Sequence, residues 1–200
     1  LEAETPYIAP GESIFFWRTV ENLPPILTDA EWARLRESGF LHEQGRVCNL
    51  SPDYGRVIRR GLGAERAEAE RLLAGAQDNE QAEFYCCAIA SIDAVLDLCA
   101  RYQKAAEDCG SPHAGVLSRV PREGARTFHE ALQSLRILQY ALWCEGEYHN
   151  TLGRFDQYMW PYLECDLRDG RLTESAALEL LEEFFLSLNR DSDLYPGIQQ

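Results

Sequence analysis

A helical pattern that is apolar on nearly every side, over residues 127–144, limits most strongly what this chain can fold into. Thr127 and Glu130 form a capping box at its start. Apolar residues then follow at helical spacing on two faces, which are Phe128, Leu132, Leu135, Leu138 and Leu142 on the first and Ile137, Tyr140 and Cys144 on the second. Because a helix of this kind is usually buried inside a large body, we expect a substantial, mainly helical protein around it.

Further helices are predicted on both sides of this one. The longest, over Asn79–Asp108, repeats apolar residues for about eight turns and predicts plain core rather than a binding site. Pro161 either kinks a later helix or stands in its restarted first turn. Ser13–Val20 favours a strand. The helices are predicted at 28–39, 53–62, 64–74, 79–108, 127–144, 155–169 and from Thr173 onward, with Asp53 or Ser51 capping the second.

These patterns divide one mainly α segment into three parts. An extended lead-in covers residues 1–27, a helical region covers 28–189, and residues 190–200 resemble the entry to a strand. The first residue is leucine and the last stretch stops within a segment, so we expect a fragment of a longer polypeptide.

Charge and composition exclude several classes of function. A formal net charge of −14 disfavours binding to nucleic acids and to anionic membranes. No run reaches the roughly 18 apolar residues that cross a bilayer, and no signal peptide is visible, so we expect a cytoplasmic protein. Seven irregularly spaced cysteines predict reduced core thiols. The four histidines share no metal-like spacing, so no metal site is expected.

A joint rich in polar residues, Glu145–Pro161, is the best candidate for a site. A helix joint needs one or two capping groups, and additional polar groups that enter the interior must be paired or cost about 1–3 kcal/mol each. Asp156 beside Arg154 would be an ionised acceptor held by a positive neighbour. Tyr148, eight residues before Asp156, would supply a hydroxyl donor. Such a pair suits a small polar substrate.

Two other interpretations of this joint remain open. Asp156 could cap the helix predicted at 155–169, with Arg154 bridging to Glu145 or Glu147 as an element of the fold. Asp156 could also act with Glu145 or Glu147 in acid–base hydrolysis.

Two sequence runs carry a family resemblance. They are G-R-F-D-Q-Y-M-x-P at Gly153–Pro161 and E-A-L-Q at Glu130–Gln133. With the sequence around them, the chain resembles the large catalytic subunits of glycyl radical enzymes, the pyruvate formate-lyase-like family that includes diol dehydratases, the choline lyase and arylacetate decarboxylases. The resemblance implies a ten-stranded α/β barrel wrapped by helices. This chain would be an amino-terminal portion that supplies mainly the helical wrapping.

The family's chemistry, as the resemblance implies it, runs through radicals. A separate iron–sulfur activating enzyme uses S-adenosylmethionine to install a glycyl radical, which passes to a cysteine that takes a hydrogen atom from the substrate. A C–C or C–heteroatom bond of a small molecule then breaks. The G-C-x-E-P-type and R-V-x-G-Y-type loops that carry these residues do not occur in this sequence, so no catalytic residue is expected here. A homodimer is expected for the whole enzyme.

The resemblance also implies which residues bind the substrate. In the dehydratase and choline lyase branch, the aspartate of G-R-F-D-Q-Y contacts a substrate hydroxyl, and the tyrosine eight residues earlier lies in the same pocket. Those positions are Asp156 and Tyr148 here, with Arg154 and Gln157 in supporting roles.

Asn49 departs from the branch pattern. It stands four residues before Asp53, where that branch has a histidine near its pocket. An amide binds a ligand but does not titrate, so Asn49 implies a different substrate from a simple diol.

Because both radical loops are missing from the sequence, a non-catalytic, standalone helical interaction module remains the alternative.

Overall fold

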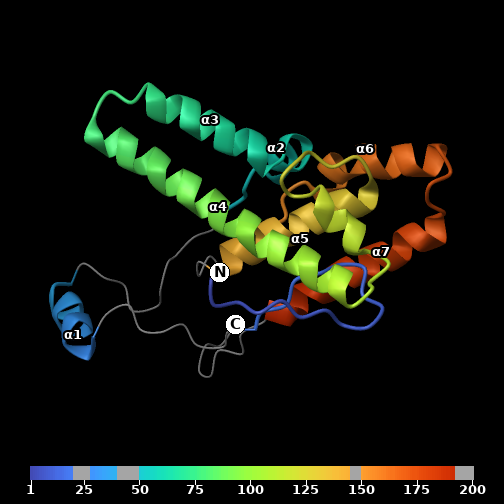
Figure 1. The fold of residues 1–200 in the computed structure, drawn as a ribbon, viewed down its shortest axis with the longest axis horizontal. Coiled ribbons are helices and arrows are strands. Elements are labelled where there is room, and N and C mark those ends of the chain that lie inside the picture. The colour runs from blue at the N-terminus through green and yellow to red at the C-terminus, as the bar shows by residue number, and fades with distance from the viewer. Residues whose placement is uncertain (20–27, 40–49, 145–149, 192–200) are drawn as a thin grey trace.

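The computed structural model describes residues 1–19, 28–39, 50–144 and 150–191, and it shows a helical protein (Figure 1). Within these ranges there is no strand, only an isolated parallel bridge between Leu50 and Asn150. The α-helices are α1 (Asp29–Glu37), α2 (Tyr54–Arg60), α3 (Leu62–Ala74), α4 (Asn79–Asp108), α5 (Phe128–Cys144), α6 (Phe155–Arg168) and α7 (Glu174–Ser187), with short 3₁₀ helices η1 (Ala114–Ser118) and η2 (Leu188–Asp191).

The predicted helix starts are confirmed by their caps. Thr28 and Glu31 form the expected capping box, in which the Glu31 carboxylate accepts from the Thr28 backbone N–H at 2.8 Å. Asp53 caps α2 by accepting from Arg56 N at 3.0 Å. Thr173 caps α7 in the same way. The starts of these three helices are therefore encoded locally.

The central helix is α5, and its two predicted apolar faces serve two cores. On one side Ile137 and Tyr140 join a buried cluster with Phe16 and Tyr102, where Phe16 stacks on Tyr102 with ring centroids 4.1 Å apart. On the other side Leu132 belongs to a cluster shared with α2, α6 and α7. The expectation of a helix buried nearly all round is confirmed.

The prediction of plain core along α4 is wrong for the first half of that helix. Burial begins at Leu96, whereas the side chain of Phe84 is 68% exposed. Figure 1 shows why: α3 and the first half of α4 form a hairpin that projects from the other helices. The prediction of core cysteines is wrong for Cys86 and Cys87, which are exposed on this hairpin, and it is confirmed for Cys99, which is buried.

The strand predicted at Ser13–Val20 is also wrong, as far as residues 13–19 are concerned. Side chains take the place of a neighbouring strand and bind the backbone of the segment directly. At the buried Phe16, the backbone adopts a φ of 91°, which no regular strand allows. The backbone N–H groups of Ser13 and Ile14 donate to Glu183, that of Phe15 donates to Gln133, and that of Trp17 donates to the Tyr102 hydroxyl oxygen. Arg136 donates to the Phe16 carbonyl oxygen.

His129 on α5 ties this segment down and makes its stability depend on pH. Its Nε2 lies 2.6 Å from the Ser13 carbonyl oxygen. Burial lowers the pKa of His129, and the nearby ring of His113 acts in the same direction. Because the unfolded chain then takes up the proton first, the free energy of unfolding should fall as the pH drops below the ordinary histidine value of about 6.5, by at most about 1.4 kcal/mol per pH unit.

Denaturant unfolding of the protein that carries this chain, at several pH values between 7.5 and 5, would measure this slope. His129→Gln keeps a donor for Ser13 but cannot titrate, so its slope should be shallower. The two proteins differ at residue 129 alone, so the difference between their slopes reports on the imidazole of His129. Parallel pH profiles for the two proteins would contradict the role given to His129.

Gly124 is required where the loop before α5 crosses the end of α2. A Cβ at Gly124 would lie 2.0 Å from the Arg59 carbonyl oxygen. Gly124→Ala should therefore lower the free energy of unfolding by about 3 kcal/mol. Gly115→Ala is the matched control, because a Cβ there meets nothing within 4 Å. Equal unfolding midpoints for the two variants would show that the backbone at the crossing shifts to accept the added methyl group without a loss of stability.

Candidate functional site

Two polar segments that are far apart in the sequence lie side by side. One directly precedes α2 in the chain and the other directly precedes α6. Leu50 and Asn150 form the parallel bridge, and Thr151 N donates to Leu50 O at 2.9 Å. The Thr151 hydroxyl reaches Ser51 Oγ at 3.3 Å. The joint that the sequence marked as a candidate site therefore meets the loop before Asp53.

A polar cleft of about 330 Å³ opens where these segments meet. Hydroxyl, amide and guanidinium groups gather in it, so it offers hydrogen-bond donors and acceptors to a small polar molecule. Its lining residues are Ser51, Pro52, Asp53, Tyr54, Gly55, Arg59, Leu152, Gly153, Arg154, Gln157 and Tyr158.

Two glycines set the shape of the polar cleft. Gly153 turns the chain into α6 with a φ of 59°, and a Cβ there would lie 3.1 Å from Ser51 Oγ. Gly55 lets α2 approach α6, because a Cβ there would lie 2.9 Å from Tyr158 Cβ. The first turns of both helices are thus held close to the cleft.

The two tyrosines of the polar cleft are neutral hydrogen-bonding groups. The Tyr54 hydroxyl donates to Asn150 Oδ1 at 3.3 Å, and burial raises the pKa of Tyr54 to about 12. The Tyr158 hydroxyl donates to the Leu152 carbonyl at 2.7 Å, and its pKa is raised as well, mainly by burial and also by electrostatic coupling to Tyr54. Both hydroxyls therefore stay protonated at neutral pH and can orient a ligand without accepting its proton.

Arg154 and Asp156 form a two-pronged ion pair at the edge of the polar cleft. Arg154 Nε and Nη2 lie 3.0 and 2.7 Å from the two carboxylate oxygens. Bonding to Arg154 lowers the pKa of Asp156, so the carboxylate stays ionised. Both side chains are about two-thirds exposed, at 69% and 67%, so the pair adds little to stability.

The predicted site residues fall into three groups. Arg154 and Gln157 line the polar cleft. Asp156 lies beside it in the first turn of α6, and the N-cap position that one interpretation assigned to Asp156 is occupied by Arg154. Tyr148 and Asn49 lie outside the described residues, as do the two glutamates proposed for hydrolysis, Glu145 and Glu147.

The groups of the polar cleft that the sequence did not identify include Tyr54, Arg59 and Tyr158. Arg59 follows Gly55 by four residues, so both lie on one face of α2. The spacing alone does not identify Arg59 as a site residue, because it does not show that the face of α2 that carries Gly55 packs against α6. Tyr158 belongs to the G-R-F-D-Q-Y run, but its hydroxyl is placed by the contact between the two helices.

Metal-binding geometry is missing from the described part of the chain, where no three His, Cys, Asp or Glu side chains gather closely enough to hold an ion. None of the described helices is both long and apolar enough to cross a membrane.

Similarity to known proteins supports a single family. The family model described as pyruvate formate lyase-like matches residues 21–197. The chain is 32% identical over 163 residues to the isethionate sulfite-lyase of Nitratidesulfovibrio vulgaris, covering 72% of this chain and 20% of that protein. It is 24% identical over 179 residues to the (2S)-3-sulfopropanediol dehydratase of Klebsiella oxytoca, covering 80% of this chain and 22% of that protein.

Solved structures show the same relationship. A structure concerned with 1,2-propanediol dehydration in Roseburia inulinivorans matches with a TM-score of 0.67 and 30% identity, over 72% of this chain and 20% of that one. A glycyl radical enzyme from Archaeoglobus fulgidus matches with a TM-score of 0.69 and 26% identity, over 81% and 24%. The chain spans about a fifth of the length of the curated relatives it matches. It belongs to the pyruvate formate lyase-like family of glycyl radical enzymes, as its G-R-F-D-Q-Y run predicted.

Proposed function

We propose that this chain is part of a glycyl radical lyase or dehydratase that cleaves a C–C or C–heteroatom bond of a small polar substrate. In this proposal the chain supplies substrate-binding groups, and the radical glycine and the reacting cysteine lie outside its 200 residues. The observation that carries the proposal is the polar cleft, in a chain of this family, where the joint at Gly153 meets the segment before Asp53.

Each group in the polar cleft has a role that its chemistry supports. Asp156 accepts a hydrogen bond from a substrate hydroxyl, because each of its carboxylate oxygens keeps lone-pair capacity beyond the bond to Arg154. Arg154 keeps that carboxylate ionised and oriented. Gln157 adds an amide donor and acceptor from the same turn of α6.

Tyr148 and Asn49 are proposed as further substrate contacts. Asn49 directly precedes Leu50 in the sequence, and Tyr148 precedes Asn150 by two residues. Leu50 and Asn150 form the bridge at the cleft, so the two proposed contacts stand within two residues of that bridge in the sequence. An asparagine there would bind the substrate by its amide and would not move a proton.

The partners of the whole protein follow from the same proposal. They are a small-molecule substrate, an activating enzyme that installs the radical with S-adenosylmethionine, and a second subunit of the same kind. The setting is the cytoplasm of an anaerobically growing cell. Sulfonates are the first substrates to test, because isethionate sulfite-lyase and (2S)-3-sulfopropanediol dehydratase are named for them.

Anaerobic activation of the protein encoded by the complete reading frame tests the proposal. Mixing it with its activating enzyme and S-adenosylmethionine should give a glycyl-radical signal in electron paramagnetic resonance, and a panel of diols and hydroxyalkyl sulfonates should reveal the substrate. A complete reading frame without the cysteine and glycine loops would end the radical hypothesis.

Behaviour of the isolated 200-residue chain separates the proposal from the standalone module. A part of a larger enzyme should aggregate or melt without cooperativity, because it exposes apolar surface that the remainder covers. A monodisperse chain with a sharp, cooperative transition would favour the helical interaction module instead.

A further inference from the structure

Among the arginines of α2 and α6, Arg59 alone has no acidic partner in the described part of the chain. On the same helix, Arg56 and Arg60 both pair with Glu65 of α3, at 2.9 and 3.3 Å. Arg59 stands on another face of α2, four residues after Gly55, and it lines the polar cleft. Acidic residues outnumber lysine and arginine by 33 to 19, so composition does not explain a cation without a carboxylate.

We infer that Arg59 binds the anionic head group of the substrate, a sulfonate or a carboxylate, while Asp156 holds the hydroxyl end. This inference deepens the function proposed above and rests on it. A guanidinium presents its N–H donors as a planar fork that matches two oxygens of such a head group. The polar cleft has a volume of about 330 Å³, at the small end of ligand pockets, which suits a molecule of a few carbon atoms.

The guanidinium of Arg59 lies at the crossing of α2 and α6. A Cβ at Gly55 would lie 3.4 Å from Arg59 Nη1 and 2.9 Å from Tyr158 Cβ. The glycine therefore leaves the space in which the fork lies close to α6. Burial raises the pKa of Tyr162 on that helix, and the positive charge of Arg59 opposes the rise. The charge of Arg59 thus acts on the α6 side of the crossing.

The backbone that carries Arg59 is held by the loop before α5. A Cβ at Gly124 would lie 2.0 Å from the Arg59 carbonyl oxygen, so the loop crosses in direct contact with this residue. In the same loop, Ala125 N donates to the Ile58 carbonyl oxygen at 2.9 Å. A binding group on a fixed backbone loses less conformational freedom when a ligand arrives, which favours affinity.

The other charged groups around the polar cleft already have partners. Arg154 is paired with Asp156 through both carboxylate oxygens. The Asp53 carboxylate accepts from Arg56 N at the start of α2. Arg59 is therefore the cation that is left for a ligand within the described residues of the cleft. Because the two carboxylates repel an anion and Arg59 attracts it, the charges orient a substrate that has one anionic end.

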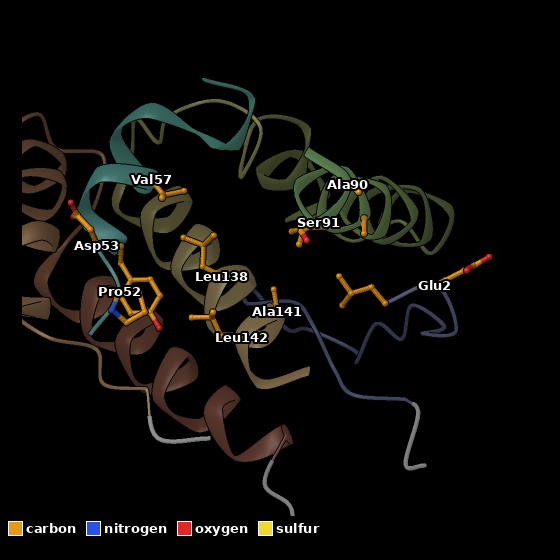
Figure 2. Close-up of a pocket in the computed structure, with 13 residues that line it drawn as sticks. Glu2, Pro52, Asp53, Val57, Ala90, Ser91, Leu138, Ala141 and Leu142 are labelled. Carbon is orange, nitrogen blue, oxygen red and sulfur yellow. The ribbon is translucent and has the colours of Figure 1, made fainter. Parts of the chain in front are cut away.

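A larger hollow, of about 700 Å³, is unsuited to an anion. Figure 2 shows Val57 of α2 and Leu138 and Leu142 of α5 among the side chains that line it. The charged residues that line it in the described part of the chain are Glu2 and Asp53, and both are acidic. An anionic head group is therefore favoured in the polar cleft over this hollow.

Binding measurements on the unactivated protein from the complete reading frame test the inference. Isothermal titration calorimetry with 2-hydroxyethanesulfonate, 3-hydroxypropanoate and neutral 1,3-propanediol compares two anionic head groups with none. At least one anion should bind more tightly than the diol. Arg59→Gln should raise the Kd of that anion about 10- to 100-fold relative to the Kd of the diol, the loss expected for a charge-assisted, two-pronged contact. Arg59→Lys should recover part of the loss, because lysine keeps the charge but not the fork.

Arg60→Gln is the matched control for charge. It removes the same charge from the next residue of α2, but Arg60 pairs with Glu65 and does not line the polar cleft. Its ratio of anion to diol Kd should stay at the wild-type value. A wild-type protein that binds neither anion more tightly than the diol overturns the inference. A ratio that Arg59→Gln leaves unchanged, or that Arg60→Gln shifts equally, does so as well.

Two further readouts complete the experiment. The relative affinities of the sulfonate and the carboxylate show which head group the cleft prefers. The glycyl-radical signal of the activated protein reports separately on the proposed function, since binding is measured without activation. A normal radical signal together with a negative binding result would refute the role of Arg59 alone.

Discussion

Replacing Asp156 with asparagine should lower the kcat/KM of the activated full-length enzyme roughly 10- to 100-fold, the loss expected for one charge-assisted hydrogen bond to the substrate. Asparagine has the same size but no charge, so the substrate hydroxyl loses its ionised acceptor. It also cannot reproduce the two-pronged pairing with Arg154, at 3.0 and 2.7 Å, that orients the group. Steady-state kinetics with the substrate found by screening would measure the effect, and the radical signal should remain at its normal level.

Asp108→Asn is the matched control for this experiment. Asp108 is 65% exposed and paired with Lys104, against 67% for Asp156 in its pair with Arg154. The two substitutions therefore remove similar surface ion pairs, but only one lies at the polar cleft. Unchanged kinetics for Asp108→Asn together with a loss for Asp156→Asn would support substrate binding. If Asp156→Asn keeps full turnover, both the substrate-binding and the hydrolytic hypotheses lose their central residue.

The helices could be predicted from the sequence because their signals are local. Capping residues such as Thr28 and Thr173 bond to backbone groups within three residues of themselves. The two apolar faces of α5 follow from helical spacing alone, and each meets one of the two cores. The bridge between Leu50 and Asn150 joins residues a hundred positions apart, and no local pattern reveals it.

The lead-in and α4 could not be predicted because their environment is set elsewhere. The strand-like residues around Phe16 are bonded by side chains of α5, such as Gln133 and Arg136, and the sequence does not show that these will replace a strand. Apolar spacing in α4 indicates that something covers the helix, but it does not say whether the cover lies in this chain. Phe84 belongs to this apolar spacing, and it is exposed in the described part of the chain.

The chemistry of the joint and the family resemblance together predicted part of the candidate site. Arg154 and Gln157 belong to the G-R-F-D-Q-Y run and line the polar cleft. Arg59 was missed because its place depends on the approach of α2 to α6 at Gly55, where a Cβ would lie 2.9 Å from Tyr158 Cβ. A contact of that kind is a tertiary property, which one sequence without relatives does not reveal.

Replacing Asp166 with alanine should lower the free energy of unfolding by about 3 kcal/mol, as much as is expected for Gly124→Ala. Asp166 is only 1% exposed. Its carboxylate accepts from Phe128 N at 2.7 Å and from Arg171 Nε at 2.6 Å. Phe128 is the first residue of α5, so a side chain near the end of α6 caps the central helix from another element. Alanine would leave that N–H buried without its acceptor.

In the protein from the complete reading frame, thermal unfolding of Asp166→Ala should show a lower Tm, by less than the roughly 6–12 °C that the same loss would cost a single domain of 150–250 residues. Asp169→Ala is the control, because Asp169 also pairs with Arg171, at 2.8 Å, but its side chain is 36% exposed and bonds to no buried N–H. Its Tm should hardly move. Equal shifts for the two variants would mean that the surface ion pairs of Arg171, rather than the cap on α5, hold α6 in place. A larger fall in Tm for Asp166→Ala would show that the packing of α6 depends on the Asp166 carboxylate. The same carboxylate caps α5, the helix around which both cores form.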